Sequence, residues 1–229
     1  MLDSKRILFE DNHLLIVNKK AGELAQGDST GDKTLLDEAK AYIKEKYNKP
    51  GDVFLAVVHR LDRPTSGVII YARTSKAAAR LSEAFQKRDL EKTYWAIVQE
   101  MPEDDEGTLV HYLKKNPTNN RSHASIKDRP GYKKAVLHYK FVGRADRYSM
   151  IEVKLETGRH HQIRAQLSAI GCPIKGDLKY GAGRSNPDGS ISLHARSLKF
   201  THPVTKKVLF IKAPVPKDNL WQTLEKLQK

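Results

Sequence analysis

The sequence has little of what a secreted or membrane-spanning protein needs. It contains one cysteine, Cys172, which excludes an intrachain disulfide and suits a reducing compartment. No apolar run approaches the roughly 18 residues that cross a bilayer, and residues 1–15 carry no cleavable secretory pattern. We therefore expect a cytoplasmic protein that has no membrane partner.

Acidic residues are also fewer than basic residues. The chain has 41 Lys and Arg against 27 Asp and Glu, a formal net charge of +14. The most basic part is 113–147, where the only acids are Asp128 and Asp146. A basic surface attracts polyanions, and nucleic acid is the commonest polyanion in a cytoplasm. The alternative is a basic protein whose lysines form a solvated surface without a nucleic-acid partner.

Several common catalytic patterns are missing as well. The chain has neither a GxxxxGK[ST] phosphate loop nor a GxSxG nucleophile turn. Cys172 has no partner cysteine for a zinc site, and on a helix the adjacent His160 and His161 would point about 100° apart. No cluster of carboxylates suits a metal-dependent nuclease, which stays a third hypothesis. We expect no metal and no cofactor.

The hydrophobic periodicity predicts an α+β protein. Leu35, Ala39 and Ile43 recur at helical spacing after Thr34, a residue suited to cap a helix. The predicted helices are 34–47, 75–88, 160–170 and 221–227, and the predicted strands include 93–99, 148–155, 192–200 and 207–213. Strands and helices do not alternate regularly, which favours a mixed, largely antiparallel central sheet flanked by helices. Because no linker interrupts the chain, we expect residues 1–229 to form a single domain.

One carboxylate stands out in the stretch VVHRLDRPTSGVIIY, residues 57–71. Asp62 lies between Arg60 and Arg63 at the end of an apolar segment. It is either one half of an ion pair that stabilises a turn or a reactive group held by a rigid strand. The neighbouring cations favour its ionised form, which suits nucleophilic attack. An acid on a phosphate-binding surface costs affinity, so a chemical role would explain its presence.

Part of this stretch, HRLDRPTSG, resembles the signature of the RluA-type pseudouridine synthases. Five further blocks resemble the same family, in the same order along the chain. They are NKKAG at 18–22, KTYWAIV at 92–98, TGRHHQIRAQL at 157–167, GCPIKGDLKYG at 171–181 and LHARSLKFTHP at 193–203. The resemblance covers about residues 7 to 215.

Three positions depart from the family pattern. Lys20 stands where the family has proline, His160 where it often has threonine, and Gln166 where it often has histidine. None of them replaces a residue that the resemblance assigns to the reaction. We expect the departures at His160 and Gln166 to affect how RNA is held.

The resemblance implies an isomerase that converts uridine in RNA into pseudouridine without cofactor or metal. It implies that Asp62 starts the reaction as nucleophile or base, and that Arg164 pairs with Asp62. Tyr94 would stack on the target uracil. Arg60 would help to expel the target nucleotide from the RNA, and Lys92 would contact phosphate.

The resemblance also implies the pseudouridine-synthase fold with a central basic cleft. The family pattern begins by Ile7, so we expect no S4 RNA-binding domain before it, and we expect a monomer. The substrate would be transfer RNA or ribosomal RNA. An alternative from another class is a non-catalytic RNA-binding or ribosome-assembly factor on the same fold.

Overall fold

A computed structural model describes residues 2–27 and 31–227. The chain divides into two compact units, Met1–Glu91 with Ala195–Pro214, and Lys92–His194 with Val215–Lys229. We call them unit 1 and unit 2, and each is described by itself. The chain passes between the units three times, so neither is a continuous stretch of sequence.

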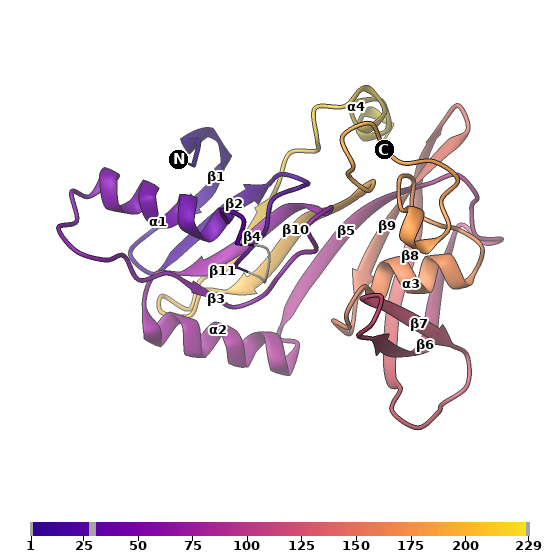
Figure 1. The fold of residues 1–229 in the computed structure, drawn as a ribbon, viewed down its shortest axis with the longest axis horizontal. Helices are drawn as coiled ribbons and strands as arrows, with labels where there is room; N and C mark the ends of the chain where they lie inside the picture. Colours follow the sequence, from indigo (N-terminus) through magenta and orange to yellow (C-terminus); the bar gives the residue numbers. More distant parts are fainter. Residues whose placement is uncertain (1, 28–30, 228–229) are drawn as a thin grey trace. The chain divides into compact units, whose positions relative to one another are not determined.

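Among the described residues, unit 1 contains two α-helices, one short 3-10 helix, five complete strands and most of a sixth (Figure 1). Its strands are β1 (Ile7–Glu10), β2 (Leu14–Lys19), β3 (Ala56–Val57), β4 (Ser66–Ala72), β10 (Leu193–Thr201, of which 195–201 belong to unit 1) and β11 (Val208–Lys212). Its helices are the short 3-10 helix η1 (Ser4–Arg6) and the α-helices α1 (Leu35–Lys46) and α2 (Ser75–Lys87).

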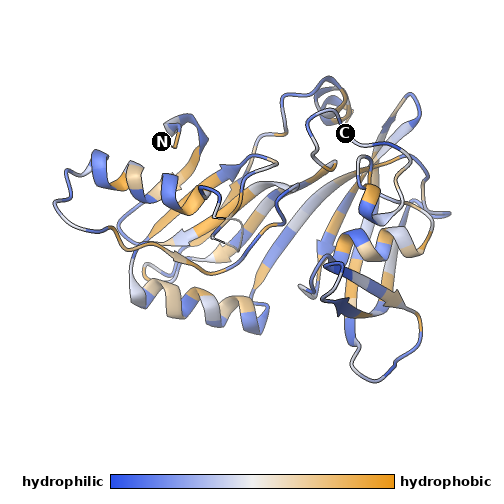
Figure 2. Cartoon of the chain, in the orientation of Figure 1, coloured by the Kyte–Doolittle hydropathy of each residue, from blue (hydrophilic) through white to orange (hydrophobic). Residues whose placement is uncertain are grey.

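The strands of unit 1 pair in the order β1-β2-β4-β10, with β11 against β10 and β3 against β4. The β1–β2, β2–β4, β3–β4 and β10–β11 pairs are antiparallel. Every residue of β4 is buried, as expected for a central strand covered on both faces. Figure 2 shows the corresponding hydrophobic residues along β2 and β4.

One face of this sheet packs against α2. Alternate residues of β2 and β4, such as Leu14, Ile16 and Ile70, form a buried cluster with Ala77 and Leu81 of α2. At roughly 25 cal/mol per Å² of buried apolar surface, such clusters supply most of the favourable free energy of folding. The rigid strands then hold the loop that joins β3 to β4.

The predicted helix starts in unit 1 are confirmed. Thr34 caps α1, and Asp37 completes the capping box by accepting from the Thr34 amide at 3.0 Å. Thr74 caps α2 through its side chain, which accepts from the Ala77 amide. Each cap is worth about 1 kcal/mol, because it satisfies amide groups that the helix leaves without partners.

Unit 2 contains a five-stranded antiparallel sheet and two α-helices. Its strands are β5 (Leu90–Val98, beginning two residues before the unit), β6 (Glu106–Asn116), β7 (Arg121–Ser125), β8 (Lys133–Ala145) and β9 (Tyr148–Leu155). Its helices are α3 (Gln162–Ala169), the 3-10 turn η2 (Leu178–Tyr180) and α4 (Asn219–Lys226). The strand order is β5-β9-β8-β6-β7.

Residues 113–147, which the sequence marked only as basic, turn out to be mostly strand. β6 and β7 form a hairpin in which Asn116 lies opposite Arg121, and β8 pairs with β6. In β8, Ala135, Leu137 and Tyr139 are buried at every second position, but the exposed lysines of the strand obscure this alternation in the sequence. The α+β class with largely antiparallel strands is confirmed.

The two faces of the unit 2 sheet carry different clusters. Ala96, Leu137, Ile151 and Val153 pack with Ile163 and Leu167 of α3, and Tyr94 joins this cluster. Trp95, Ile97 and Met150 face the other way and pack with Trp221 and Leu224 of α4. The strand alternation therefore puts Tyr94 on the same face as α3.

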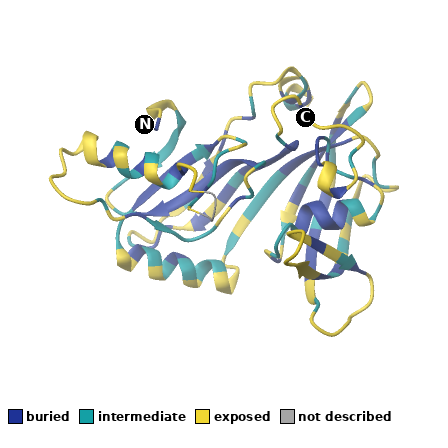
Figure 3. Ribbon diagram, viewed as in Figure 1, coloured by how far each residue is buried: buried dark blue, intermediate teal, exposed yellow. Residues whose placement is uncertain are grey.

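The helix α3 is enclosed by protein along most of its length. All six residues from Gln162 to Leu167 are buried, which Figure 3 shows as a nearly continuous dark segment. Arg164 lies inside this buried segment, and only 5% of the residue is exposed. A buried arginine requires a partner, because an isolated charge is costly away from water.

No helix in the described part of the chain is long and apolar enough to cross a membrane.

Candidate active site

Asp62 lies in the loop that joins β3 to β4 in unit 1. The loop turns directly after Asp62, whose carbonyl oxygen accepts from the Thr65 amide at 3.0 Å. The Arg63 carbonyl accepts from the Gly22 amide at 2.8 Å, which ties this turn to the segment after β2. Asp62 is half-buried. Its main chain is therefore held in place while part of the residue stays accessible.

The ammonium group of Lys19 lies beneath this loop. Its Nζ donates to the carbonyl oxygens of Thr65 at 2.7 Å, Lys20 at 3.0 Å, Arg63 at 3.0 Å and Asp62 at 3.3 Å. An ammonium has three N–H groups, so the four carbonyls share them. Lys19 is completely buried, and this burial lowers the pKa of its amine to about 8. Unit 1 thus uses a buried cation to hold the backbone around Asp62.

Close packing also constrains the start of β4. Gly67 has a φ of +115°, and a Cβ added there would lie 2.3 Å from the Ala195 carbonyl oxygen. No other residue fits this position without displacing the backbone of β10. The glycine of the HRLDRPTSG block is therefore a requirement of the strand packing.

The two arginines beside Asp62 have different surroundings. Arg63 pairs with Asp32 at 3.0 Å and donates from Nε to the Gly22 carbonyl at 3.0 Å. Arg60 is exposed. The Arg63 guanidinium therefore binds two partners besides the residues next to it in the sequence, Asp32 and the Gly22 carbonyl. The exposure of Arg60 suits the predicted contact with RNA.

Lys92 and Tyr94 lie on β5 in unit 2. Tyr94 is half-buried, lies opposite Val153 of β9, and packs on the α3 side of the sheet. Lys92 reaches the segment before α3, where a Cβ added to Gly158 would lie 3.2 Å from its Nζ. Unit 2 therefore brings β5 and the TGRHHQIRAQL block together on one face of its sheet.

Arg164 has a bidentate partner that the sequence did not reveal. Its Nε donates to Oδ2 of Asp177 at 2.7 Å, and its Nη2 donates to Oδ1 at 2.9 Å. The Asp177 side chain is 1% exposed. Two parallel hydrogen bonds fix the plane of the guanidinium as well as its position. The pairing of Arg164 with Asp62 stays a prediction, since the two residues belong to different units.

Tyr180 completes the surroundings of Arg164. Its ring lies against two guanidinium groups, with Cζ of Arg164 and of Arg121 at 4.9 and 5.0 Å from the ring centre. Its hydroxyl accepts from the Ser122 amide at 2.7 Å and bonds Nδ1 of His161 at 2.9 Å. Burial raises the pKa of this hydroxyl, which favours its neutral form. The ring thus links β7, α3 and η2.

The adjacent histidines do not behave as helical neighbours. α3 begins at Gln162, because His161 has a left-handed φ of 52° and lies before the helix. The rings of His160 and His161 stack with centroids 3.8 Å apart, which corrects the expectation of side chains 100° apart. No group of three metal-ligating side chains occurs among the residues that the structure describes.

The two departures in the TGRHHQIRAQL block also have structural partners. The Ser122 hydroxyl lies 2.9 Å from Nδ1 of His160 and donates to the His160 carbonyl at 2.7 Å. Gln166 is completely buried, and its amide donates to the Leu109 carbonyl at 3.0 Å. Gln166 joins α3 to β6 inside unit 2. Gln166 therefore has a packing role inside unit 2, and the expectation that it alters how RNA is held stays a prediction.

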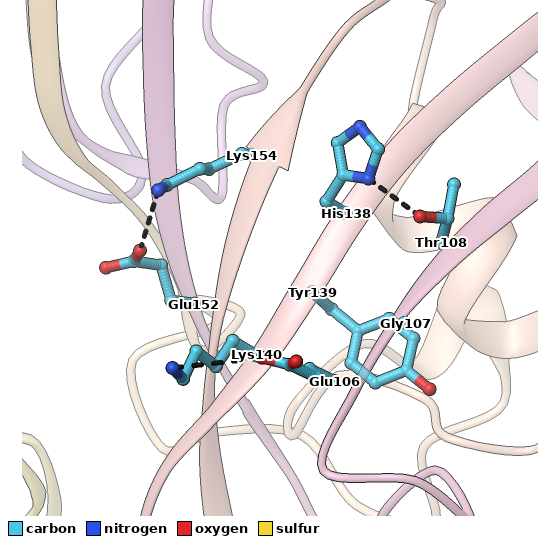
Figure 4. A pocket seen from close by; sticks show the side chains of 8 residues that line it. All are labelled: Glu106, Gly107, Thr108, His138, Tyr139, Lys140, Glu152 and Lys154. Carbon is cyan, nitrogen blue, oxygen red and sulfur yellow. Dashed lines mark hydrogen bonds and ion pairs between the residues drawn. The ribbon is translucent and has the colours of Figure 1, made fainter.

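A separate hollow of about 400 Å³ lies on the sheet of unit 2. Its lining, drawn in Figure 4, alternates acids and lysines. Tyr94 lies opposite Val153, and the same row across the sheet continues through Tyr139 and Gly107. The neighbouring row, one residue further along each strand, contains Lys154, His138 and Thr108. Because side chains alternate across a strand, this row points away from the α3 face.

Thr108 and His138 line the hollow and form a chain of contacts with the carboxylate of Glu156. Oγ1 of Thr108 lies 2.8 Å from Nδ1 of His138, whose Nε2 lies 2.7 Å from Glu156. This is the order of groups in a nucleophile triad. The side chains of His138 and Glu156 are 44% and 56% exposed, so water competes for both contacts. We assign this hollow no part in catalysis.

Sequence reasoning missed three residues that hold Asp62 or Arg164 in place within its own unit. Lys19, Asp177 and Tyr180 all lie inside quoted blocks, NKKAG and GCPIKGDLKYG, but received no role. Each is an ionisable or aromatic residue within an otherwise apolar or glycine-rich block. A charged residue in such a setting indicates burial with a partner, and that signal was available.

Comparisons with known proteins agree on one family. Residues 13–169 match the family model described as RNA pseudouridylate synthase. The Bacillus subtilis protein named uncharacterized RNA pseudouridine synthase YhcT is 37% identical over 95% of this chain and 71% of its own length. The ribosomal large subunit pseudouridine synthase D of Zymomonas mobilis is 34% identical over 93% of this chain and 69% of its own.

Solved structures show the same fold. Human RNA pseudouridylate synthase domain containing 4 superposes with a TM-score of 0.79 at 23% identity, covering 98% of this chain and 93% of that one. Human RNA pseudouridylate synthase domain containing 1 gives 0.72 at 26% identity, covering 95% and 86%.

Proposed function

Starting from the finding that this chain belongs to the RNA pseudouridylate synthase family, we propose that Asp62 starts the isomerisation of uridine to pseudouridine in a structured RNA. The chain is an RNA pseudouridine synthase, an isomerase. The observation that supports the role of Asp62 is its setting, a half-accessible carboxylate on a backbone held by Lys19.

The reaction exchanges one bond to the sugar for another. The bond between N1 of uracil and C1′ of the ribose breaks, the base turns, and C5 bonds to C1′. N1 gains a proton and C5 loses one, so no oxidant, reductant or group donor is required. Asp62 acts by attacking the uracil ring, by attacking C1′ or by removing a sugar proton.

Four other residues are proposed to serve the same reaction from both units. Arg164 holds the charge of Asp62, and the bidentate bond to Asp177 supports this role because it orients the guanidinium in advance. Tyr94 stacks on the target uracil. Arg60 takes the place of the extruded nucleotide, and Lys92 contacts phosphate.

The basic region supports RNA binding. Eight of its ten cations are exposed and take part in no ion pair within the described residues. These are Lys114, Lys115, Arg121, Lys127, Arg129, Lys133, Lys134 and Arg144. Cations without an acidic partner can neutralise phosphates without first breaking an ion pair, which favours sequence-independent affinity for RNA.

The direct test replaces the proposed reactive group. Asp62→Asn keeps the shape and removes the charge, so we expect pseudouridine formation on native RNA to fall at least about 10³-fold, a loss of more than 4 kcal/mol in transition-state stabilisation. Asp128→Asn, which removes an exposed acid, serves as the matched control and should keep full activity. Full activity of the Asp62→Asn protein would exclude Asp62 as the reactive group.

The substrate and setting complete the proposal. We infer transfer RNA or ribosomal RNA as substrate, and the name of the Zymomonas relative favours the large ribosomal subunit. Mapping pseudouridines in total RNA from cells with and without the gene would identify the position. We further propose that the enzyme works in the cytoplasm as a monomer without metal or cofactor.

The second candidate function is a non-catalytic RNA-binding or ribosome-assembly factor on the same fold. The basic surface favours it no less than it favours an enzyme. Cells that carry only the Asp62→Asn protein separate the two: rescue of a growth or assembly defect by this protein would support the binding function. Failure of rescue, with pseudouridine also lost, supports the enzyme.

A further inference from the structure

The imidazole of His59 takes the place of a backbone carbonyl beside β4. Its Nε2 accepts a hydrogen bond from the Ile70 amide at 3.0 Å. In antiparallel sheets such amides are normally bonded by the carbonyl of the neighbouring strand. An interaction between a side chain and a central strand therefore marks a point where the regular ladder has been interrupted.

The strand register indicates that the carbonyl replaced by the His59 side chain is that of Val58. β3 pairs with β4 through Ala56 opposite Ala72 and Val57 opposite Tyr71. Continued for one residue, this register would set Val58 opposite Ile70, but β3 ends at Val57. The chain turns away from β4 at this point, and the His59 side chain supplies the missing acceptor. A buried amide left without an acceptor would cost stability.

The His59 ring is also clamped by α2. The rings of His59 and Phe85 stack with centroids 4.7 Å apart and planes inclined by 17°. Phe85 lies in the last turn of α2, a helix whose inner face packs on β4. The hydrogen bond fixes one edge of the imidazole and the stack fixes its plane, so the ring has a single defined placement.

His59 precedes Asp62 by three residues in the HRLDRPTSG block. The far end of that loop is held by Lys19 through the carbonyls of Asp62, Arg63 and Thr65. The near end leaves β3 at Val57, and the hydrogen bond between His59 and Ile70 attaches it to β4. The loop that carries Asp62 is thus anchored to β4 on one side and to the Lys19 ammonium on the other.

We propose that His59 is a positioning residue for Asp62, acting as a side-chain substitute for a strand carbonyl. The inference rests on the proposed role of Asp62 and adds to it the residue that sets where the loop begins. A displacement of about 1 Å at a reacting group can cost about 100-fold in rate. The His59 hydrogen bond prevents such a displacement at the entry to the loop.

Two substitutions separate the hydrogen bond from the ring. His59→Phe keeps an aromatic ring for Phe85 but cannot accept from the Ile70 amide. His59→Gln carries an oxygen at a similar reach and can accept the bond, although it loses the stack. We expect His59→Phe to lower kcat by about 10- to 100-fold with KM for RNA changed by less than about twofold. We expect His59→Gln to stay within about threefold of the wild-type kcat.

A second measurement tests the hydrogen bond between the Ile70 amide and His59 directly. Amide hydrogen exchange at Ile70 should become faster in His59→Phe and stay slow in His59→Gln, because only the former lacks an acceptor. Assays are run well below the melting temperature of each variant, so that unfolding does not lower kcat. Equal losses of kcat in both variants, or unchanged Ile70 exchange in His59→Phe, would overturn the proposal.

The outcome for His59 stays separate from the outcome for Asp62. If Asp62→Asn is inactive while His59→Phe has full kcat, the positioning role fails and the proposed reaction stands. If Asp62→Asn is fully active, the assignment of Asp62 fails, and with it the positioning role, whatever the Ile70 exchange shows.

Discussion

The loop around Asp62 and the surroundings of Arg164 hold their key residue in opposite ways. In unit 1, the side chain of Lys19 binds four backbone carbonyls, so the main chain around Asp62 is held directly. In unit 2, Asp177 and Tyr180 hold the Arg164 guanidinium by side-chain contacts.

The difference follows from the reach of the two residues. An aspartate has a short side chain, so its carboxylate is placed once its backbone is placed. An arginine has a long side chain, so a fixed helix leaves its end undetermined until partners hold it. We therefore expect substitutions near Arg164 to act through charge and orientation, and substitutions near Asp62 to act through the main chain.

The largest effect is expected at Asp177. Asp177→Asn removes the carboxylate that binds the buried Arg164 guanidinium through two hydrogen bonds, which should lower the free energy of unfolding by about 3–5 kcal/mol and also reduce kcat. Chemical denaturation and single-turnover kinetics measure the two effects. Glu156→Gln, which changes an exposed acid, is the control and should have little effect on either.

The same pair allows a sharper version of this test. In the double variant Arg164→Met with Asp177→Leu, apolar side chains replace both charges, so much of the lost stability should return. Activity should not return, since Arg164 is proposed to act on the charge of Asp62. A stable and active double variant would contradict the role assigned to Arg164.

The next largest effect is expected at Lys19. Lys19→Met removes one donor from each of four carbonyls, of which those of Asp62 and Arg63 keep the Thr65 and Gly22 amides. It should cost about 2–3 kcal/mol, with a lower kcat because the ammonium no longer holds the Asp62 loop. Lys20→Met alters the exposed neighbour and is the matched control. A wild-type kcat in Lys19→Met would show that the loop keeps its position without the ammonium.

Lys19 also predicts a pH dependence of stability. Burial lowers the pKa of its amine in the folded protein to about 8 from 10.5, so between these values the unfolded chain binds the extra proton. Its contribution to stability is therefore fully present above about pH 10.5 and is lost as the pH falls through about 8. The difference in unfolding free energy between wild type and Lys19→Met should rise by up to about 3 kcal/mol from pH 8 to 10.5. If the difference in unfolding free energy did not change with pH, the hydrogen bonds to the carbonyls would be offsetting the effect of burial on the pKa of Lys19.

The smallest effect is expected at Tyr180. Tyr180→Phe keeps the ring between Arg121 and Arg164 but removes the hydroxyl that accepts from the buried Ser122 amide. Thermal unfolding should report a loss of about 1–2 kcal/mol. Tyr132→Phe, whose hydroxyl makes an exposed contact of 3.3 Å with His123, should lose less than about 0.5 kcal/mol. Equal losses of stability in the two variants would show that the buried hydrogen bond between Tyr180 and Ser122 stabilises the fold no more than the exposed contact of Tyr132.

Most elements, and the block that contains Asp62, were predictable because their signals are local. The capping box of α1 involves residues three positions apart, and β9 was predicted with its observed bounds, 148–155. The strands β6 and β8 were missed, because lysines on their exposed face obscure the period of two. The start of α3 was placed two residues early, because no sequence rule anticipated the left-handed conformation of His161.

The six blocks follow the order seen in the RluA-type pseudouridine synthases, and this resemblance, which the family model confirms, predicted the reaction class and the chemical groups of the candidate site. The partners that hold those groups were not readable. Lys19 meets Thr65 across 46 positions, Ser122 meets Tyr180 across 58, and His59 meets Ile70 because β3 stops one residue early. Such contacts arise from strand register and helix packing, which bring distant residues within hydrogen-bond distance only after the chain has folded.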